Sequence, residues 1–161
     1  MLLIAVGNKF RRDDGVALEV ADRVRALALP DVEVIECAGD VMSLVDRWAG
    51  RDLVIIVDAV ASGECPGTLH RRDLLMYPLP RHWFAASSHQ LGLADGVELG
   101  RIMQRLPERM LFIGVEGENF GEGTGLSPEV EHAVPIVIEI MKAERAQPSP
   151  AIPASRCEGR P

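Results

Sequence analysis

The segment 1–15 constrains the fold most, because it combines a strand-like run with two acidic residues beyond its end. An apolar run at 2–6 stops at Gly7 and Asn8, and Asp13 and Asp14 follow just before a helical pattern begins. An apolar run of this length that ends in a glycine turn is typical of a buried strand. The two carboxylates therefore lie beyond the carboxyl end of the first predicted strand. In an open α/β sheet this edge is where ligands bind.

Strand-like and helical patterns alternate along the rest of the chain. We expect strands at 2–6, 32–36, 53–57, 68–75 and 110–115, and helices at 15–29, 41–48, 87–106 and 128–146. The strand at 68–75 contains Arg71, Arg72 and Asp73, which suits a solvated antiparallel edge. Pro135 predicts a kink or a restart in the last helix. The alternation with short links predicts an α/β fold, a three-layer sandwich whose mostly parallel, twisted sheet of about five strands has helices on both faces.

Length and composition indicate one domain and exclude some classes of partner. The chain has 161 residues, enough for a single α/β domain at 1–146, and the proline-rich stretch 147–161 has too little apolar content to fold and predicts a disordered tail. A net charge of −7 argues against nucleic acid, and no apolar run is long enough for a membrane span. Three widely spaced cysteines, Cys37, Cys65 and Cys157, suit reduced thiols and a cytoplasmic protein.

Three side chains that are able to bind a metal ion are predicted to reach the same edge of the sheet. Asp14 follows the first strand, Asp58 ends the central strand, and His89 opens a later helix. Two carboxylates and one imidazole suit a first-row ion such as zinc, nickel or iron, with coordination positions left open. The dipoles at the two helix starts favour an ionised Asp14 and a neutral His89. The pattern therefore predicts a metal site.

Each of these residues also has a simpler explanation. Asp13 or Asp14 could be the N-cap of the first helix, which is a common use of aspartate. Asp58 could be an ordinary loop acid, and His89 a capped surface histidine. A nucleotide-binding loop is disfavoured, because 7–15 has neither the G-x-G-x-x-G nor the P-loop pattern and its carboxylates would repel phosphate. The expected meeting of three residues at one edge favours the metal site.

Nucleophilic catalysis has weaker support in the sequence. Ser87 and Ser88 precede His89, but neither lies in a nucleophile elbow. Ser87 and Gln90 have the spacing of a capping box, which already explains the serine. The cysteines that follow strand ends have no recognisable histidine partner. We therefore assign no catalytic nucleophile.

Four longer motifs lie in order along the chain. They are V-G-N-x-x-x-x-D-D-G-V-A at 6–17, I-V-D-A-V at 56–60, S-S-H-Q-L-G-L-A at 87–94 and G-V-E-G-x-x-F-G-x-G-x-x-L-S-P-x-V at 114–130. In these motifs the sequence resembles the hydrogenase maturation proteases, endopeptidases that trim the C-terminal extension of the large subunit of nickel–iron hydrogenases. The resemblance runs from residue 1 to about 141. It implies metal contacts by Asp14, Asp58 and His89.

The resemblance also implies what the chain binds. The metal would be nickel carried by the substrate, already inserted in the large-subunit precursor, so no tightly bound intrinsic metal is expected. The partner would be that precursor, with no nucleic acid and no membrane involved, and the protein would be a monomer. Gly7, Asn8 and Glu36 are expected to shape the substrate pocket. Glu36 begins a segment where the family often has an aspartate followed by a glycine-rich turn.

One alternative function stays open at this point. A non-enzymatic nickel-checking or nickel-carrying protein would bind the precursor without cleaving it. It would need the same metal-binding residues and the same partner. Because the sequence reveals no nucleophile, it does not separate this alternative from a peptidase.

Overall fold

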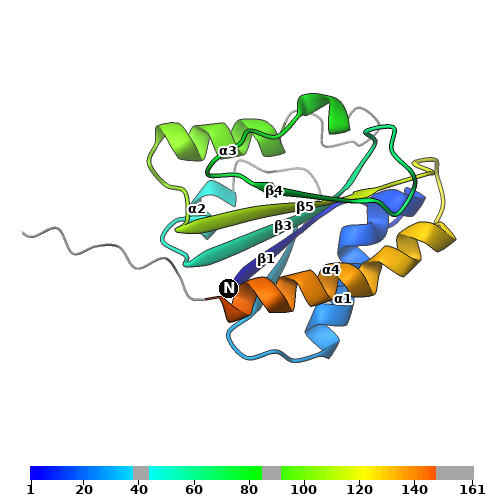
Figure 1. Cartoon of the computed structure of the whole chain (residues 1–161), viewed down its shortest axis with the longest axis horizontal. Coiled ribbons are helices and arrows are strands. Elements are labelled where there is room, and N and C mark those ends of the chain that lie inside the picture. The colour runs from blue at the N-terminus through cyan, green and yellow to red at the C-terminus, as the bar shows by residue number, and fades with distance from the viewer. Residues whose placement is uncertain (38–43, 85–91, 148–161) are drawn as a thin grey trace, which may run out of the picture.

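The computed structural model describes residues 1–37, 44–84 and 92–147, and within these ranges the strands form one sheet. Its order is β2-β1-β3-β5-β4, and all neighbours are parallel except β4, which pairs antiparallel with β5 at one edge (Figure 1). The strands are β1 (Leu2–Val6), β2 (Glu33–Cys37), β3 (Leu53–Val60), β4 (Leu69–Asp73) and β5 (Arg109–Glu116). The predicted mostly parallel sheet and its antiparallel edge are confirmed.

Helices cover both faces of this sheet (Figure 1). The helices are α1 (Val16–Ala26), α2 (Leu44–Trp48), α3 (Leu93–Ile102) and α4 (Pro128–Ala146), with short 3-10 turns η1 (Arg12–Gly15) and η2 (Arg81–Phe84). One apolar cluster joins α1 and α4 to the sheet, and a second joins α2 and α3 to its other face. The three-layer architecture is therefore confirmed.

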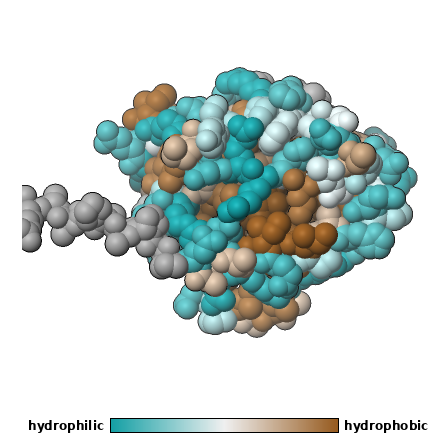
Figure 2. Space-filling model, viewed as in Figure 1, coloured by the Kyte–Doolittle hydropathy of each residue, from teal (hydrophilic) through white to brown (hydrophobic). Residues whose placement is uncertain are grey.

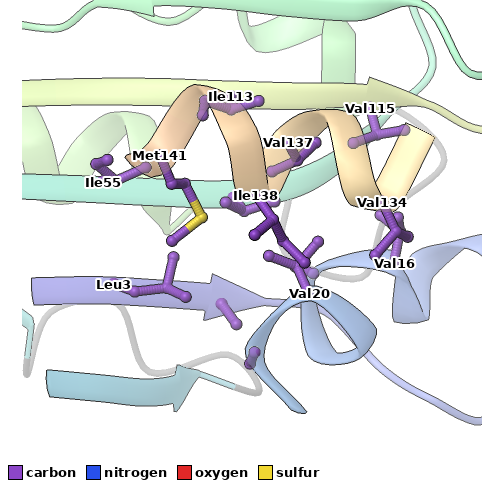
Figure 3. Packing of buried hydrophobic residues seen from close by; sticks show 14 of the residues in the cluster. Leu3, Val16, Val20, Ile55, Ile113, Val115, Val134, Val137, Ile138 and Met141 are labelled. Atoms are coloured by element: carbon purple, nitrogen blue, oxygen red, sulfur yellow. The ribbon is translucent and has the colours of Figure 1, made fainter. Parts of the chain in front are cut away.

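The alternation of side chains along the central strands supplies both clusters. In β3, Ile55 and Val57 face the α1 and α4 layer, whereas Val54 and Ile56 face the α2 and α3 layer. Figure 3 shows Val134, Ile138 and Met141 of α4 packed above the sheet, with Val16 and Val20 of α1 beside them. Burying one such aliphatic side chain contributes about 1.5–3 kcal/mol. The two clusters hold the central strands, and hence their carboxyl ends, in fixed positions.

Two helices are shorter than the sequence predicts. The first, predicted at 15–29, occupies Val16–Ala26, and Leu27 is its C-cap. α3, predicted at 87–106, begins at Leu93 with Gly92 at its N-cap. The capping box predicted at 87–90 lies outside the described residues. At their carboxyl ends both helices stop short of the prolines expected to end them, at Ala26 before Pro30 and at Ile102 before Pro107, because a proline excludes helix at its own position without requiring helix up to it.

Two other predictions, the end of the third strand and a restart of the last helix, are wrong. β3 continues to Val60, because Asp58 pairs with Gly114 and Val60 with Glu116 of β5. Asp58 therefore lies inside the strand and not beyond its end. The last helix does not restart at Pro135, since α4 runs as one element from Pro128 to Ala146. Burial of its apolar face outweighs the roughly 3 kcal/mol penalty of an internal proline.

The surface in the view of Figure 2 is mostly hydrophilic, with apolar side chains gathered over the middle of α4. Ile136 of this helix is 53% exposed. Among the described residues no helix combines the length and the hydropathy that crossing a bilayer requires. Of the tail predicted at 147–161, only Gln147 belongs to the described residues.

Candidate functional site

The turn after β1 brings Asp14 back against the end of that strand. The Asn8 N–H donates a hydrogen bond to the Asp14 carbonyl oxygen at 3.1 Å, and the Asp14 N–H donates to the Arg11 carbonyl at 3.1 Å. A Cβ atom at Gly7 would lie 2.0 Å from the Asp14 oxygen, so only glycine permits this approach. Asp14 is fully buried as a result. Gly7 and Asn8, predicted to shape the substrate pocket, thus build the turn that carries Asp14.

Asp58 is buried near the carboxyl end of the central strand β3, on the face of the sheet that α2 and α3 cover. Its neighbours at alternate positions, Ile56 and Val60, belong to the apolar cluster of that face. Asp58 Oδ1 accepts a hydrogen bond from the Ala59 N–H at 2.8 Å, whereas Oδ2 accepts none from a described residue. The residue beside it on β5 is Gly114, which places no side chain against the carboxylate. One oxygen of Asp58 is therefore oriented by the backbone, while the other is buried without a hydrogen-bond partner among the described residues.

The charge of Asp14 acts on the carboxyl group of Asp58, so the side chains of these two residues lie near each other at the carboxyl edge of the sheet. Burial raises the pKa of Asp58 well above its usual range, the charge of Asp14 raises it further, and the Ala59 N–H partly opposes the shift. Two ionised carboxylates in a buried setting are unfavourable unless a cation neutralises them. The pair is therefore suited to oxygen coordination of a metal ion.

The third predicted metal contact, His89, lies outside the described residues. Within 1–37, 44–84 and 92–147, no group of three or more histidine, cysteine, aspartate or glutamate residues is placed to hold a metal ion. The alternative that Asp13 or Asp14 caps the first helix is wrong, because the N-cap of α1 is Gly15 and no side chain makes a cap hydrogen bond there. The carboxylates of Asp13 and Asp14 therefore do not cap α1.

Asp13 has a role that sequence reasoning missed. Its buried carboxylate accepts hydrogen bonds from the N–H groups of Glu118 at 2.9 Å, Asn119 at 2.8 Å and Ser127 at 2.6 Å. The Ser127 hydroxyl donates to Asp13 Oδ2 at 2.8 Å. These four bonds fasten the loop between β5 and α4 to the turn that carries Asp14. Nothing near Asp13 in the sequence signals partners so far along the chain.

Glu36, the remaining predicted pocket residue, lies on β2 with a 45% exposed side chain. It forms an ion pair with Arg25 of α1. It also lines a hollow of about 560 Å³ together with Lys9 and Phe10. Glu36 therefore lies at the hollow beside Lys9 and Phe10, and its ion pair with Arg25 already explains its charge.

A second buried carboxylate, also missed, lies on the same face of the sheet as Asp58. Glu116 Oε1 accepts hydrogen bonds from the N–H groups of Ser62 and Gly63, and Oε2 accepts one from the Ser62 hydroxyl at 2.7 Å. His70 Nε2 lies 2.9 Å from Oε2. Burial raises the pKa of Glu116, but the hydrogen bonds together lower it by more than burial raises it. The net pKa of Glu116 is therefore below its usual value. The group fixes the loop between β3 and β4.

Comparison with known sequences leads to one group of proteins. Residues 18–144 match the model of a family described as hydrogenase maturation protease, a segment that contains Asp58 and begins just after Asp14. The chain is 32% identical over 158 residues to the hydrogenase 2 maturation protease of Escherichia coli K12, with 95% of each chain covered. It is 25% identical over 150 residues to a hydrogenase expression/formation protein of Thiocapsa roseopersicina, covering 91% of this chain and 68% of that protein.

Comparison with solved structures gives the same result. A hydrogenase maturating endopeptidase from Escherichia coli is 32% identical and superposes with a TM-score of 0.73 over 89% of this chain and 91% of its own. The solution structure of an endopeptidase from Escherichia coli is 30% identical, with a TM-score of 0.74 over 97% of this chain and 99% of its own. The sheet and its covering helices are therefore shared with these enzymes.

Proposed function

Because this chain belongs to the hydrogenase maturation protease family and is a peptidase, we propose that it removes the C-terminal extension of a nickel–iron hydrogenase large-subunit precursor. Cleavage would follow nickel insertion, and the inserted nickel would be the feature that the enzyme recognises. The metal is then part of the substrate, and the enzyme keeps no tightly bound ion of its own. We place this reaction in the cytoplasm and expect the enzyme to act as a monomer.

The burial of Asp58 near the charge of Asp14 is the observation that carries this proposal. In the proposal, Asp14 and Asp58, with His89, contact the nickel of the precursor. An arriving cation removes the repulsion between the carboxylates, whereas an empty precursor brings no compensating charge. The enzyme would thus bind the two forms with different affinity, and that difference is its specificity.

The surrounding structure supports this role by fixing the two carboxylates before the substrate arrives. The Ala59 N–H orients Asp58 through Oδ1 and leaves Oδ2 for the metal. The turn at Gly7 and the hydrogen bonds of Asp13 hold the backbone of Asp14. Preorganised ligands do not have to be ordered during binding, which favours recognition of a metal already held by another protein.

The test is incubation of the purified protein with precursor in nickel-loaded and nickel-free forms, followed by intact-mass spectrometry. We expect a mass loss only in the loaded precursor, and none with Asp58→Asn. Asp52→Asn is the matched control, because Asp52 is exposed and immediately precedes the same strand. Equal cleavage of both precursor forms would contradict recognition through nickel. Binding of loaded precursor without any mass loss would instead support the nickel-checking protein.

The metal content of the isolated protein gives a second test. Elemental analysis should find the purified protein largely free of nickel and zinc, and calorimetry should find weak binding of added nickel. The physical reason is that the remaining ligands belong to the precursor. A tightly bound ion that is needed for cleavage of any substrate would contradict this part of the proposal.

A further inference from the structure

Three exposed side chains stand next to the turn that carries Asp14, and we call Lys9, Phe10 and Arg12 the basic rim. Phe10 is 63% exposed, and Lys9 Nζ lies 5.4 Å from the centre of its ring. Phe10 therefore places an exposed aromatic ring between two cationic side chains at this turn.

The charge of the basic rim is not neutralised within the described part of the chain. Most lysine and arginine side chains there form ion pairs with carboxylates. Lys9 and Arg12 form none with any described residue, although the chain as a whole has a net charge of −7. The basic rim is therefore a local positive charge on a protein whose net charge is negative, and it would attract an acidic segment that the net charge of the protein repels.

Two hollows lie on either side of Phe10. One, of about 560 Å³, is lined by Lys9 and Arg12 and by three carboxylates that Arg23 and Arg25 already pair, those of Glu19, Asp22 and Glu36. The other, of about 700 Å³, is lined by Asn8 and Arg11. Both also include Phe10 and parts of the loop at 120–126. A partner chain that crosses the basic rim could set side chains into both hollows against the phenylalanine ring. Aromatic and arginine side chains at such positions are the usual anchors of protein interfaces.

Arg12 has a backbone conformation that fits this arrangement. Its φ angle is +48°, in the left-handed region that a residue with a side chain rarely adopts. The Arg12 N–H donates to the Gly123 carbonyl oxygen at 3.0 Å, which holds the backbone there. The Arg12 guanidinium also lies against Gly123, so the backbone and the side chain of Arg12 both contact the loop between β5 and α4.

We propose that the basic rim binds an extended, acidic segment of the large-subunit precursor next to its nickel site. The proposal rests on the proposed function, and it names the chemistry of the segment: at least one carboxylate beside an apolar side chain. The carboxylate pairs with Lys9 and Arg12, and the apolar side chain packs on Phe10. Such contacts raise the affinity for the precursor without touching the reacting bond, so they act on KM and not on kcat.

The test compares two double variants of equal charge change. Lys9→Glu/Arg12→Glu reverses the charge of the basic rim. Arg105→Glu/Lys142→Glu reverses the charge of two cations elsewhere on the surface, Arg105 in the segment after α3 and Lys142 in α4. With nickel-loaded precursor we expect the first pair to raise KM about tenfold with kcat within about twofold, and the second pair to match the wild type. The KM of the wild type should rise with salt, and that dependence should weaken in the rim variant.

Phe10→Ser tests the apolar part of the contact, and we expect it to raise KM several-fold without changing the salt dependence. Measuring the dissociation constant of the precursor directly tests the basic rim independently of cleavage. If the wild type binds the precursor but does not cleave it, the proposed processing of this precursor fails, while the dissociation constants of the same variants still test the basic rim. Equal affinity of wild type and rim variant would overturn the proposal. So would a wild-type dimer that the rim variant dissociates, because a second copy would then be the occupant.

Discussion

Ser127 and Asp13, which are 114 residues apart, share two hydrogen bonds: the Ser127 N–H donates to Asp13 Oδ1 at 2.6 Å and its hydroxyl to Oδ2 at 2.8 Å. Ser127 is the N-cap residue of α4, yet its side chain makes no cap hydrogen bond to that helix. The start of the last helix is thus held by a carboxylate from the first loop. Because Asp13 also accepts hydrogen bonds from Glu118 and Asn119, the loop between β5 and α4 is fixed at both of its ends.

Replacing Asp13 should therefore loosen this loop. Asp13→Asn removes the charge that strengthens four hydrogen bonds, and we expect a loss of about 1.5–3 kcal/mol, or roughly 5–10 °C in Tm. Ser127→Ala removes only the hydroxyl donor, so its effect should be about a third as large. Thermal unfolding by circular dichroism measures both. A Tm of Asp13→Asn equal to that of the wild type would show that these hydrogen bonds contribute nothing net.

Asp58→Asn should have the opposite effect on stability. The raised pKa of Asp58 means that folding disfavours its charged form. In the wild type this carboxyl therefore destabilises the fold progressively as the pH rises from its ordinary pKa to its raised one. Asparagine carries no charge, so at pH 7 the variant should melt a few degrees higher while processing of the precursor is lost. Lower stability of Asp58→Asn at neutral pH would contradict the assigned electrostatics.

Glu116 should contribute to acid unfolding. Its pKa is lowered in the folded protein, so its ionised form stabilises the fold fully above the ordinary pKa of 4.5. That contribution is lost as the pH falls below 4.5 and through the lowered pKa of the folded state. Unfolding free energies measured between neutral pH and acid should therefore fall less steeply for Glu116→Gln than for the wild type. Parallel pH profiles for the two proteins would refute this role.

Gly7→Ala should damage the turn that carries Asp14. The new Cβ would meet the Asp14 oxygen at 2.0 Å, so the backbone of Asp14 has to move. Gly50→Ala is the control, because Gly50 also has a positive φ angle but has nothing within 4 Å of the added atom. We expect Gly50→Ala to lose only about 1 kcal/mol from backbone strain. Gly7→Ala should lose clearly more unfolding free energy than Gly50→Ala and should process the precursor poorly. Equal unfolding free energies of the two variants would contradict the close contact.

The layers of the fold could be predicted because their signals are local. The run at 53–57 is apolar throughout, as expected for a strand covered on both faces. Its end could not be predicted, since aspartate is rare in strands and Asp58 reads as a stop. The strand continues to Val60 because β5 offers a partner for each residue, with Gly114 opposite Asp58. That pairing is set by tertiary structure and leaves no local trace.

The candidate site divides in the same way. Asp14 and Asp58 follow from the rule that the carboxyl ends of parallel strands share an edge. The function of Asp13 depends on Glu118, Asn119 and Ser127, all more than 100 residues away, and an acidic pair gives no information about such partners. The sequence therefore indicates which acidic residues lie at this edge of the sheet. Only the tertiary structure determines which of these carboxylates accepts hydrogen bonds from the distant loop.

The place of β4 affects how the protein is made. In the sheet that the described residues form, β4 pairs only with β5, which is synthesised after it and inserts between β4 and β3. A nascent chain on the ribosome can pair β1, β2 and β3, but β4 then has no neighbouring strand until Glu116 has emerged. The last two elements of the chain, β5 and α4, close the sheet and cover it. The sheet that holds Asp58 in its central strand is thus complete only after β5, the last strand of the described chain, has been translated.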